Sequence, residues 1–210
     1  MLDMIIGKLI YLPGILIGLT FHEYAHAKVA SLLGDPTPRL QGRVTLNPLA
    51  HIDLLGFVAL LLVGFGWGKP VQINGGYFRN FKRDEILVSS AGVTMNLFLA
   101  IVFAGIIKLA DISGTAFFSG SLAGSIALEM LWAAVWINVI LMVFNLIPVP
   151  PLDGFNIVAE LAHLRERGFY YQLYEKGPIL LLVLIFFNVT DKIIGPMANF
   201  LLEGIMKIYY

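Results

Sequence analysis

The stretch "TFHEYAHAK", residues 20 to 28, places two histidines four positions apart, with a glutamate beside the first, inside an apolar run from 4 to 33. A run of that length can cross a bilayer, which requires about 20 residues. Ionisable groups are costly in hydrocarbon, so within a membrane helix they mark a functional site by default. The stretch therefore predicts a membrane helix whose polar side faces protein and water.

The composition of the whole chain agrees with a membrane protein. Of its 210 residues, 58% are hydrophobic and 13% charged, and the mean hydropathy is +0.82. Soluble domains of this length are less apolar and carry more charge. Fourteen basic residues balance fourteen acidic ones, so no net positive charge attracts nucleic acid. The absence of cysteine excludes disulfides and thiolate metal sites.

The apolar runs predict an all-α integral membrane protein, a polytopic helix bundle forming a single domain over 1–210. A C-terminal helix over 193–208 contains Glu203 and Lys207 and fits either a last span or an interfacial helix. The other spans are expected at approximately 4–33, 84–110, 121–147 and 175–190.

The run "LLGFVALLLVGFGWG", residues 54 to 68, is apolar for only about a dozen positions, the length of a re-entrant segment. We expect the chain over approximately 54–76 to dip into the membrane and return. Polar backbone such as "KPVQINGG" survives near membrane depth only when it is buried in protein or lines a wet cavity. Two interpretations stay open for "KPVQIN", residues 69 to 74: an exposed edge strand, or part of a small internal β-hairpin.

The dip decides on which side of the membrane Asp153 lies. If 54–76 returns, the next two spans bring Asp153 to the side of His22 and His26; if it crosses, Asp153 lies on the opposite side. Basic residues favour the return, because positive loops face the cytoplasm. Six of them, Arg39, Arg43, Lys69, Arg79, Lys82 and Arg83, lie between the first two spans, whereas loop 111–120 has none. We expect a multi-pass protein of the plasma membrane, with the histidine end in the cytoplasm and the N-terminus outside.

On a helix, His22 and His26 lie on one face, one turn apart, so both imidazoles can bind one divalent ion. Glu23 is turned about a third of a revolution away. That offset keeps its carboxylate off the ion but beside an ion-bound water, whose proton it can accept. The alternative is a group of buried polar residues that pair with neighbouring helices.

A catalytic zinc requires a third protein ligand and keeps one position for water. The candidate is Asp153, which follows a proline-rich break at 148–151, where continuous helix is impossible. Gly154 then allows a close turn. The alternative role for Asp153 is to cap a helix that begins near 154.

Two other polar groups are weaker metal candidates. His51 in "NPLAHID" is a rival third ligand or a group that orients a ligand together with Asp53, although a loop histidine is more often simply exposed. Glu160 and His163 have the spacing of a di-iron pair, but the further carboxylates of such sites are missing from the sequence. We expect these two residues to face water on an interfacial helix.

The motifs "HEYAH", "NLIPVPPLDG" (145–154) and "AGVTMNLFLA" (91–100) together resemble the site-2 protease family of intramembrane zinc metalloproteases, peptidase family M50. The stretches "GRVTLNPLAHIDLLGF" (42–57) and "GWGKPVQIN" (66–74) resemble a compact bacterial branch without a PDZ or CBS domain. One position departs from the family pattern: Val93 stands where the family usually has proline, while Gly92 and Asn96 are kept.

The resemblance implies that His22, His26 and Asp153 bind Zn²⁺, that Glu23 is the general base and that Asn145 contacts substrate. It also implies that a peptide bond in or near a membrane-spanning helix of a partner protein is hydrolysed. By its own chemistry, the amide of Asn145 is suited to stabilise developing negative charge, or alternatively to bond a neighbouring helix. Two other functions stay open: a metal transporter, and an inactive relative that binds membrane partners.

Overall fold

The structure, a computed structural model, describes residues 2–63, 66–113 and 120–209. The regular secondary structure of these residues is helical, and they contain no strand, only an isolated antiparallel bridge between Ile52 and Gly68. The expected all-α class is confirmed for them. The helices are α1 (Leu2–Leu32), α2 (Thr37–Leu40), α3 (Leu54–Val63), α4 (Phe81–Ile112), α6 (Leu122–Asn145), α7 (Asp153–Leu161), α8 (Tyr170–Phe186) and α9 (Val189–Tyr209), with 3₁₀ turns at Pro48–Ala50, Gly75–Tyr77 and Leu164–Glu166.

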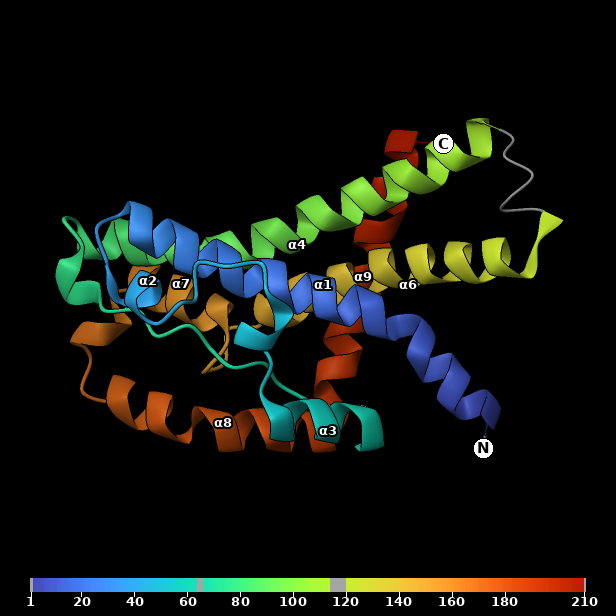
Figure 1. The fold of residues 1–210 in the computed structure, drawn as a ribbon. Helices are drawn as coiled ribbons and strands as arrows, with labels where there is room; N and C mark the ends of the chain where they lie inside the picture. Colours follow the sequence, from blue (N-terminus) through green and yellow to red (C-terminus); the bar gives the residue numbers. More distant parts are fainter. Residues whose placement is uncertain (1, 64–65, 114–119, 210) are drawn as a thin grey trace.

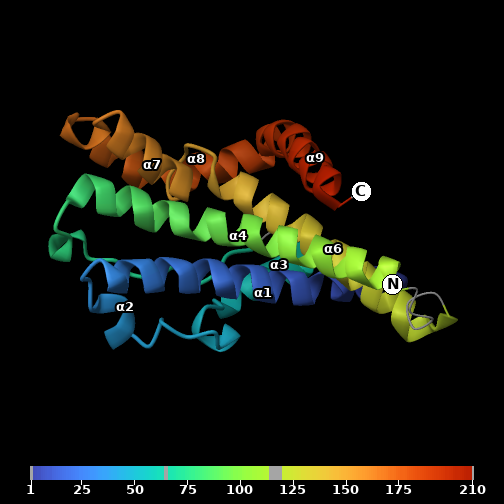
Figure 2. The ribbon, with the colours of Figure 1, turned by 90° about the horizontal axis from the view of Figure 1, so that it is seen from above.

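The helices α1, α4 and α6 run side by side, and α4 is antiparallel to the other two (Figure 1). Seen from above, α1 and α7 lie on opposite sides of α4 (Figure 2). Because α1 and α6 point the same way, their C-terminal ends lie at the same end of the bundle. The chain that leaves α6 therefore enters α7 at the end of the bundle where α1 ends, and Asp153 lies at His22 and His26, as expected.

Two glycines let α1 approach α6 closely. A Cβ atom at Gly14 would lie 2.8 Å from the Cα of Ala134, and one at Gly18 would lie 2.7 Å from a methyl group of Leu141. Glycines spaced four apart are a common device for close helix contact in membranes, because side-chain-free surfaces let backbones meet. This spacing is visible in the sequence as "GILIG", residues 14 to 18.

The largest apolar core cluster lies where α4, α6 and α9 meet. Small and β-branched side chains fill it, among them Ala100, Val135, Val139 and Ala198, each fully buried. Such residues allow helices to pack at short distance and leave few voids. This core packs α4, α6 and α9 against one another.

By length and composition, α4 and α6 are each apolar and long enough to cross a membrane, and α8 with α9 counts as a third span if that bent pair is one. The span predicted at 84–110 begins earlier as a helix, at 81, because Asn80 caps it by accepting a bond from the N–H of Arg83. Hydropathy does not detect such polar first turns. The membrane crossing expected for 4–33 stays a prediction.

The segment expected to dip begins as the helix α3 and returns as extended chain over 68–74. Residues 64–65, within the expected dip, lie outside the described residues. The Ile52–Gly68 bridge joins the start of the segment to its returning part. A longer β-hairpin is not formed by the residues described here, and a re-entrant path through a membrane stays a prediction.

The last two helices are bent by 77° at their junction. The helix α9 runs across α4 and α6, whereas α8 runs roughly along them (Figure 1). A helix nearly perpendicular to its neighbours does not continue their direction as a simple span. Whether 193–208 is a last membrane span or an interfacial helix remains a prediction.

Candidate metal centre

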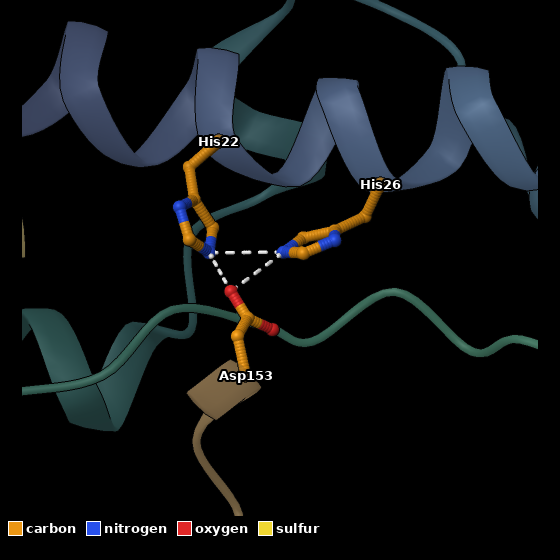
Figure 3. A group of neighbouring side chains, drawn as sticks. All are labelled: His22, His26 and Asp153. Atoms are coloured by element: carbon orange, nitrogen blue, oxygen red, sulfur yellow. Dashed lines mark hydrogen bonds and ion pairs between the residues drawn. The ribbon is translucent and has the colours of Figure 1, made fainter. Parts of the chain in front are cut away.

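Three side chains that are far apart in the sequence meet on the buried face of α1. His22 and His26 lie one helical turn apart, and Asp153, the first residue of α7, points at both from the other side (Figure 3). The Nε2 atoms of the two histidines lie 3.0 Å apart. Oδ2 of Asp153 lies 3.3 Å from Nε2 of His22 and 3.2 Å from Nε2 of His26. Within the described parts of the chain, no other three His, Cys, Asp or Glu residues lie within reach of one ion.

These three donor atoms have the spacing of a metal-binding face. In tetrahedral geometry, ligands about 2.0–2.1 Å from an ion lie about 3.3–3.4 Å from one another. The observed separations of 3.0, 3.2 and 3.3 Å are within a few tenths of an ångström of that value. A divalent ion therefore fits the triangle with little adjustment of the side chains.

The outer nitrogens of both imidazoles are occupied by acceptors. Nδ1 of His26 lies 2.8 Å from the carbonyl oxygen of Val88, and Nδ1 of His22 lies 2.7 Å from the amide oxygen of Asn96. Both Nδ1 atoms must therefore carry the proton and donate it, which leaves the Nε2 lone pairs free to bind an ion. The helix α4 thus sets the tautomer of both histidines.

The inner atoms of the triangle are then all acceptors. Oδ2 of Asp153 is buried and accepts no hydrogen bond, and the two Nε2 atoms that face it carry lone pairs. Acceptors this close repel one another, and a buried carboxylate requires a compensating charge. A cation at the centre satisfies all three atoms.

Asp153 reaches this position because the chain breaks between α6 and α7. The helix α6 ends at Asn145, and prolines at 148, 150 and 151 prevent its continuation. Leu152 is the N-cap of α7 and no side chain caps that end, so the alternative that Asp153 is the N-cap is wrong. Gly154 is required here for close approach, because a Cβ atom at that position would collide with the backbone of Leu146.

The two imidazoles pack against Gly92 of α4. A Cβ atom at Gly92 would lie 2.7 Å from Nδ1 of His22 and closer still to Nε2 of His26. The helix is continuous through the next position, where Val93 is buried in place of the family's proline. The missing proline therefore leaves the glycine surface against the histidines intact.

Glu23 is turned away from the triangle, as its position on the helix predicts. Its Oε2 accepts a 2.9 Å hydrogen bond from the backbone N–H of Val71 and lies 3.8 Å from Nη2 of Arg43. The same Arg43 nitrogen donates to the carbonyl oxygen of Lys69. Arg43 is buried and was not identified as a site residue from the sequence, where it looked only like one of several basic loop residues.

The extended segment 69–74 is held at both ends by hydrogen bonds to residues outside α1. At its start, the N–H of Lys69 donates to the carbonyl oxygen of His51. At its end, the N–H of Asn74 donates to Oδ2 of Asp35, a fully buried carboxylate just beyond α1. The segment therefore passes beside Glu23 in a defined position.

His51, the rival third ligand, lies outside the group of three. Its side chain is fully buried, and its Nε2 lies 2.8 Å from the carbonyl oxygen of Thr45. The expectation of an exposed loop histidine is wrong, because the loop folds back under segment 69–74. Asp53 does not orient a ligand but accepts the N–H of Gly56 at the start of α3.

Glu160 and His163 point to different partners and form no metal pair. Glu160 is buried and accepts a bond from Arg165, whereas His163 is exposed and lies 3.0 Å from Nζ of Lys82. The expectation that both face water is wrong for Glu160, since α7 turns that side chain toward α4.

Asn145, the expected substrate contact, is the last residue of α6 and is partly buried. Its amide nitrogen donates to the carbonyl oxygen of Leu141 in its own helix, at 2.9 Å. The amide nitrogen of Asn145 therefore bonds within α6 and does not make the interhelical hydrogen bond considered from the sequence. Its role toward substrate stays a prediction.

Comparison with known proteins identifies the family. The profile of peptidase family M50 matches residues 102–187. YwhC of Bacillus subtilis, named provisionally as a zinc metalloprotease, is 34% identical over 195 residues, which cover 93% of this chain and 88% of YwhC. The chain belongs to peptidase family M50. The predicted resemblance to the site-2 protease family is thereby confirmed, and this M50 chain is a peptidase.

More distant M50 relatives give the same assignment. Rip2 of Mycobacterium tuberculosis, also named provisionally as a zinc metalloprotease, is 32% identical over 166 residues, and Rip2 of Mycolicibacterium smegmatis is 31% identical over 158. These matches cover 74% and 70% of the M50 chain, but only 58% and 55% of the two relatives. No solved structure matches the chain significantly.

Proposed function

We propose that this M50 peptidase is a zinc metalloprotease that hydrolyses a peptide bond in or near a membrane-spanning helix of a partner protein. The observation that carries the proposal is the triangle formed by Nε2 of His22, Nε2 of His26 and Oδ2 of Asp153, with edges of 3.0 to 3.3 Å. Two imidazoles and one carboxylate are a ligand set typical of catalytic zinc, which keeps a fourth position for water or substrate.

Zinc at this site would polarise the substrate carbonyl and acidify a water molecule. Glu23 then acts as the general base, taking the proton from the water and passing it to the leaving amine. Its carboxylate is suited to this role because it lies on the same helix as His22 and His26 yet points to one side of them. The hydrogen bond from the backbone N–H of Val71 fixes the orientation of the Glu23 carboxylate before substrate binds.

The proposed membrane location rests on α4 and α6, which among the described residues are single helices apolar and long enough to span. The imidazoles meet α4 at Gly92, eleven residues after its start, which corresponds to roughly 16 Å along the helix. Such a depth places the chemistry below the end of the bundle. The basic residues at that end favour a cytoplasmic orientation in the plasma membrane.

A substrate helix must be unwound before its peptide bond is accessible, and segment 69–74 is suited to bind the unwound chain. Lys69 and Val71 direct their backbone groups toward His51, Arg43 and Glu23. Gln72, the residue after Val71, has no hydrogen bond to either backbone group within the described chain. We propose that this free edge pairs with substrate main chain, as an added strand.

Substitution of Glu23 by glutamine separates this function from its alternatives. The wild-type protein, purified in detergent, should contain about one zinc ion per chain. Glu23→Gln should keep the zinc and abolish cleavage, which a comparison of membrane proteomes from cells with either form would detect as uncut substrates. If cells with Glu23→Gln show the same fragments as wild type, the proposal fails.

The same variant tests a transporter and an inactive binding relative. A transporter loses metal flux with its ligands rather than with Glu23, and a binding protein captures the same partners with glutamate or glutamine. Zinc flux into proteoliposomes that is unchanged by Glu23→Gln, together with unchanged proteomes, would support the transporter.

A further inference from the structure

A chain of buried amides connects His22 to the third helix of the bundle. Asn96 of α4 and Asn138 of α6 are both fully buried. The nitrogen of Asn96 donates to the side-chain oxygen of Asn138, at 3.0 Å, and to the carbonyl oxygen of Gly18, at 3.2 Å. The nitrogen of Asn138 donates to the carbonyl oxygen of Ala134, at 2.8 Å.

The direction of every bond in this chain is fixed from its far end. The carbonyl of Ala134 can only accept, so the nitrogen of Asn138 faces it and the oxygen of Asn138 faces Asn96. The nitrogen of Asn96 must then face Asn138, which turns its oxygen to His22. Nδ1 of His22 is consequently the protonated nitrogen, and Nε2 carries the lone pair that a metal ion requires.

The two histidines differ in how their orientation is secured. His26 is bonded to the backbone carbonyl of Val88, which no substitution removes. His22 depends on the side chain of Asn96, whose orientation is set by Asn138 together with the carbonyl oxygen of Gly18. Gly18 makes room for this arrangement, since a Cβ atom there would lie 3.1 Å from the oxygen of Asn138.

We propose that Asn138, which is linked to His22 by two hydrogen bonds through Asn96, is a positioning residue that fixes the imidazole of His22 for metal binding. The inference rests on the proposed zinc site. It links the metal affinity of α1 to the packing of α6, a helix that contributes no ligand to the triangle.

Zinc affinity measured against a competing chelator, on full-length protein in detergent, tests this without any substrate. Loss of a group that orients a metal ligand typically weakens metal binding about 10- to 100-fold, which is expected for Asn96→Leu. Asn138→Leu should weaken binding less, roughly three- to tenfold, because Gly18 still anchors Asn96. In the Asn96→Leu background, Asn138→Leu should cause no further loss.

A conservative variant distinguishes positioning from a general role in packing. In its neutral form, the carboxyl group of Asn138→Asp can accept from Asn96 and donate to Ala134, so this variant should bind zinc within about twofold of wild type. Thr190→Val removes a buried hydroxyl from α9 and serves as the matched control, with unchanged affinity expected. The thermal unfolding of each zinc-free variant records any loss of packing separately.

The proposal is overturned if Asn138→Leu binds zinc like wild type, if its effect adds fully to that of Asn96→Leu, or if Asn138→Asp binds as weakly as Asn138→Leu. Should Asn138→Leu not fold, Asn138→Ala removes the same amide and is judged by the same criteria. Wild-type protein that binds no zinc would instead refute the proposed function, and this inference with it.

Discussion

The backbone N–H of Val71 donates a 2.9 Å hydrogen bond to Oε2 of Glu23, so the proposed general base is joined directly to the extended segment beside it. Arg43 strengthens this junction, because one of its nitrogens lies 3.8 Å from Glu23 and also donates to the carbonyl of Lys69. Orientation of the base and position of the segment are therefore coupled.

This coupling predicts the effect of Arg43→Gln. The variant should retain zinc but lose about tenfold or more in cleavage rate, since about 1.4 kcal/mol of transition-state stabilisation corresponds to a factor of ten. Arg39→Gln, at an exposed position of α2 four residues earlier, is the matched control and should be near wild type. The measurement is the rate of cleavage of a substrate identified in the proteome comparison, beside the zinc content. Equal rates for Arg43→Gln and Arg39→Gln would contradict the coupling.

A methyl group at Gly92 should disrupt the metal centre without touching a ligand. Its Cβ would press on the imidazoles of His22 and His26, so Gly92→Ala is expected to reduce the zinc content to below about half an ion per chain. Gly195→Ala is the control, because a Cβ there meets open space. Zinc is measured by mass spectrometry on purified protein. Full zinc in Gly92→Ala would show that the imidazoles have more freedom than their packing indicates.

The choice between the two candidate third ligands is open to a direct test. Asp153→Ala removes one corner of the triangle and should reduce zinc affinity by at least about 100-fold, whereas His51→Ala should change it less than about threefold. The affinity is measured against a chelator, with zinc-free unfolding as a check that both variants fold. The reverse pattern, with zinc lost from His51→Ala and kept by Asp153→Ala, would require a different site.

Arg165 holds α7 against the start of α4. Its guanidinium donates to Glu160 and lies 3.2 Å from Glu85, and it stacks over the ring of Phe81 at 4.6 Å. Arg165→Ala would leave the buried Glu160 without its partner. We expect a loss of about 1–3 kcal/mol in unfolding free energy, a range that allows for the partial exposure of Arg165.

The control for this prediction is Arg167→Ala, two positions away and exposed, which should change stability by less than about 0.5 kcal/mol. Denaturant unfolding in detergent, followed by tryptophan fluorescence, measures both. A stability of Arg165→Ala equal to that of Arg167→Ala would mean that the ion pairs contribute nothing to holding α7.

The sequence alone predicted the features that depend on local periodicity. A spacing of four puts His22 and His26 on one helical face whatever the rest of the chain does, and the same rule turns Glu23 aside. The long apolar runs placed α1, α4 and α6 to within a few residues, whereas the run at 175–190 crosses the bend between α8 and α9. The prolines after Asn145 marked the break that frees Asp153. Each of these inferences requires only the geometry of one helix or one turn.

Only the tertiary structure decided which distant groups meet. That Asp153 rather than His51 faces the imidazoles depends on the directions of α1, α4 and α6, and on how each helix is rotated about its axis. The same is true of Arg43 beside Glu23 and of Asn138 behind Asn96. These contacts join residues from 20 to more than 100 positions apart, and no local pattern records them, because a side chain's partner is set by the packing of whole helices.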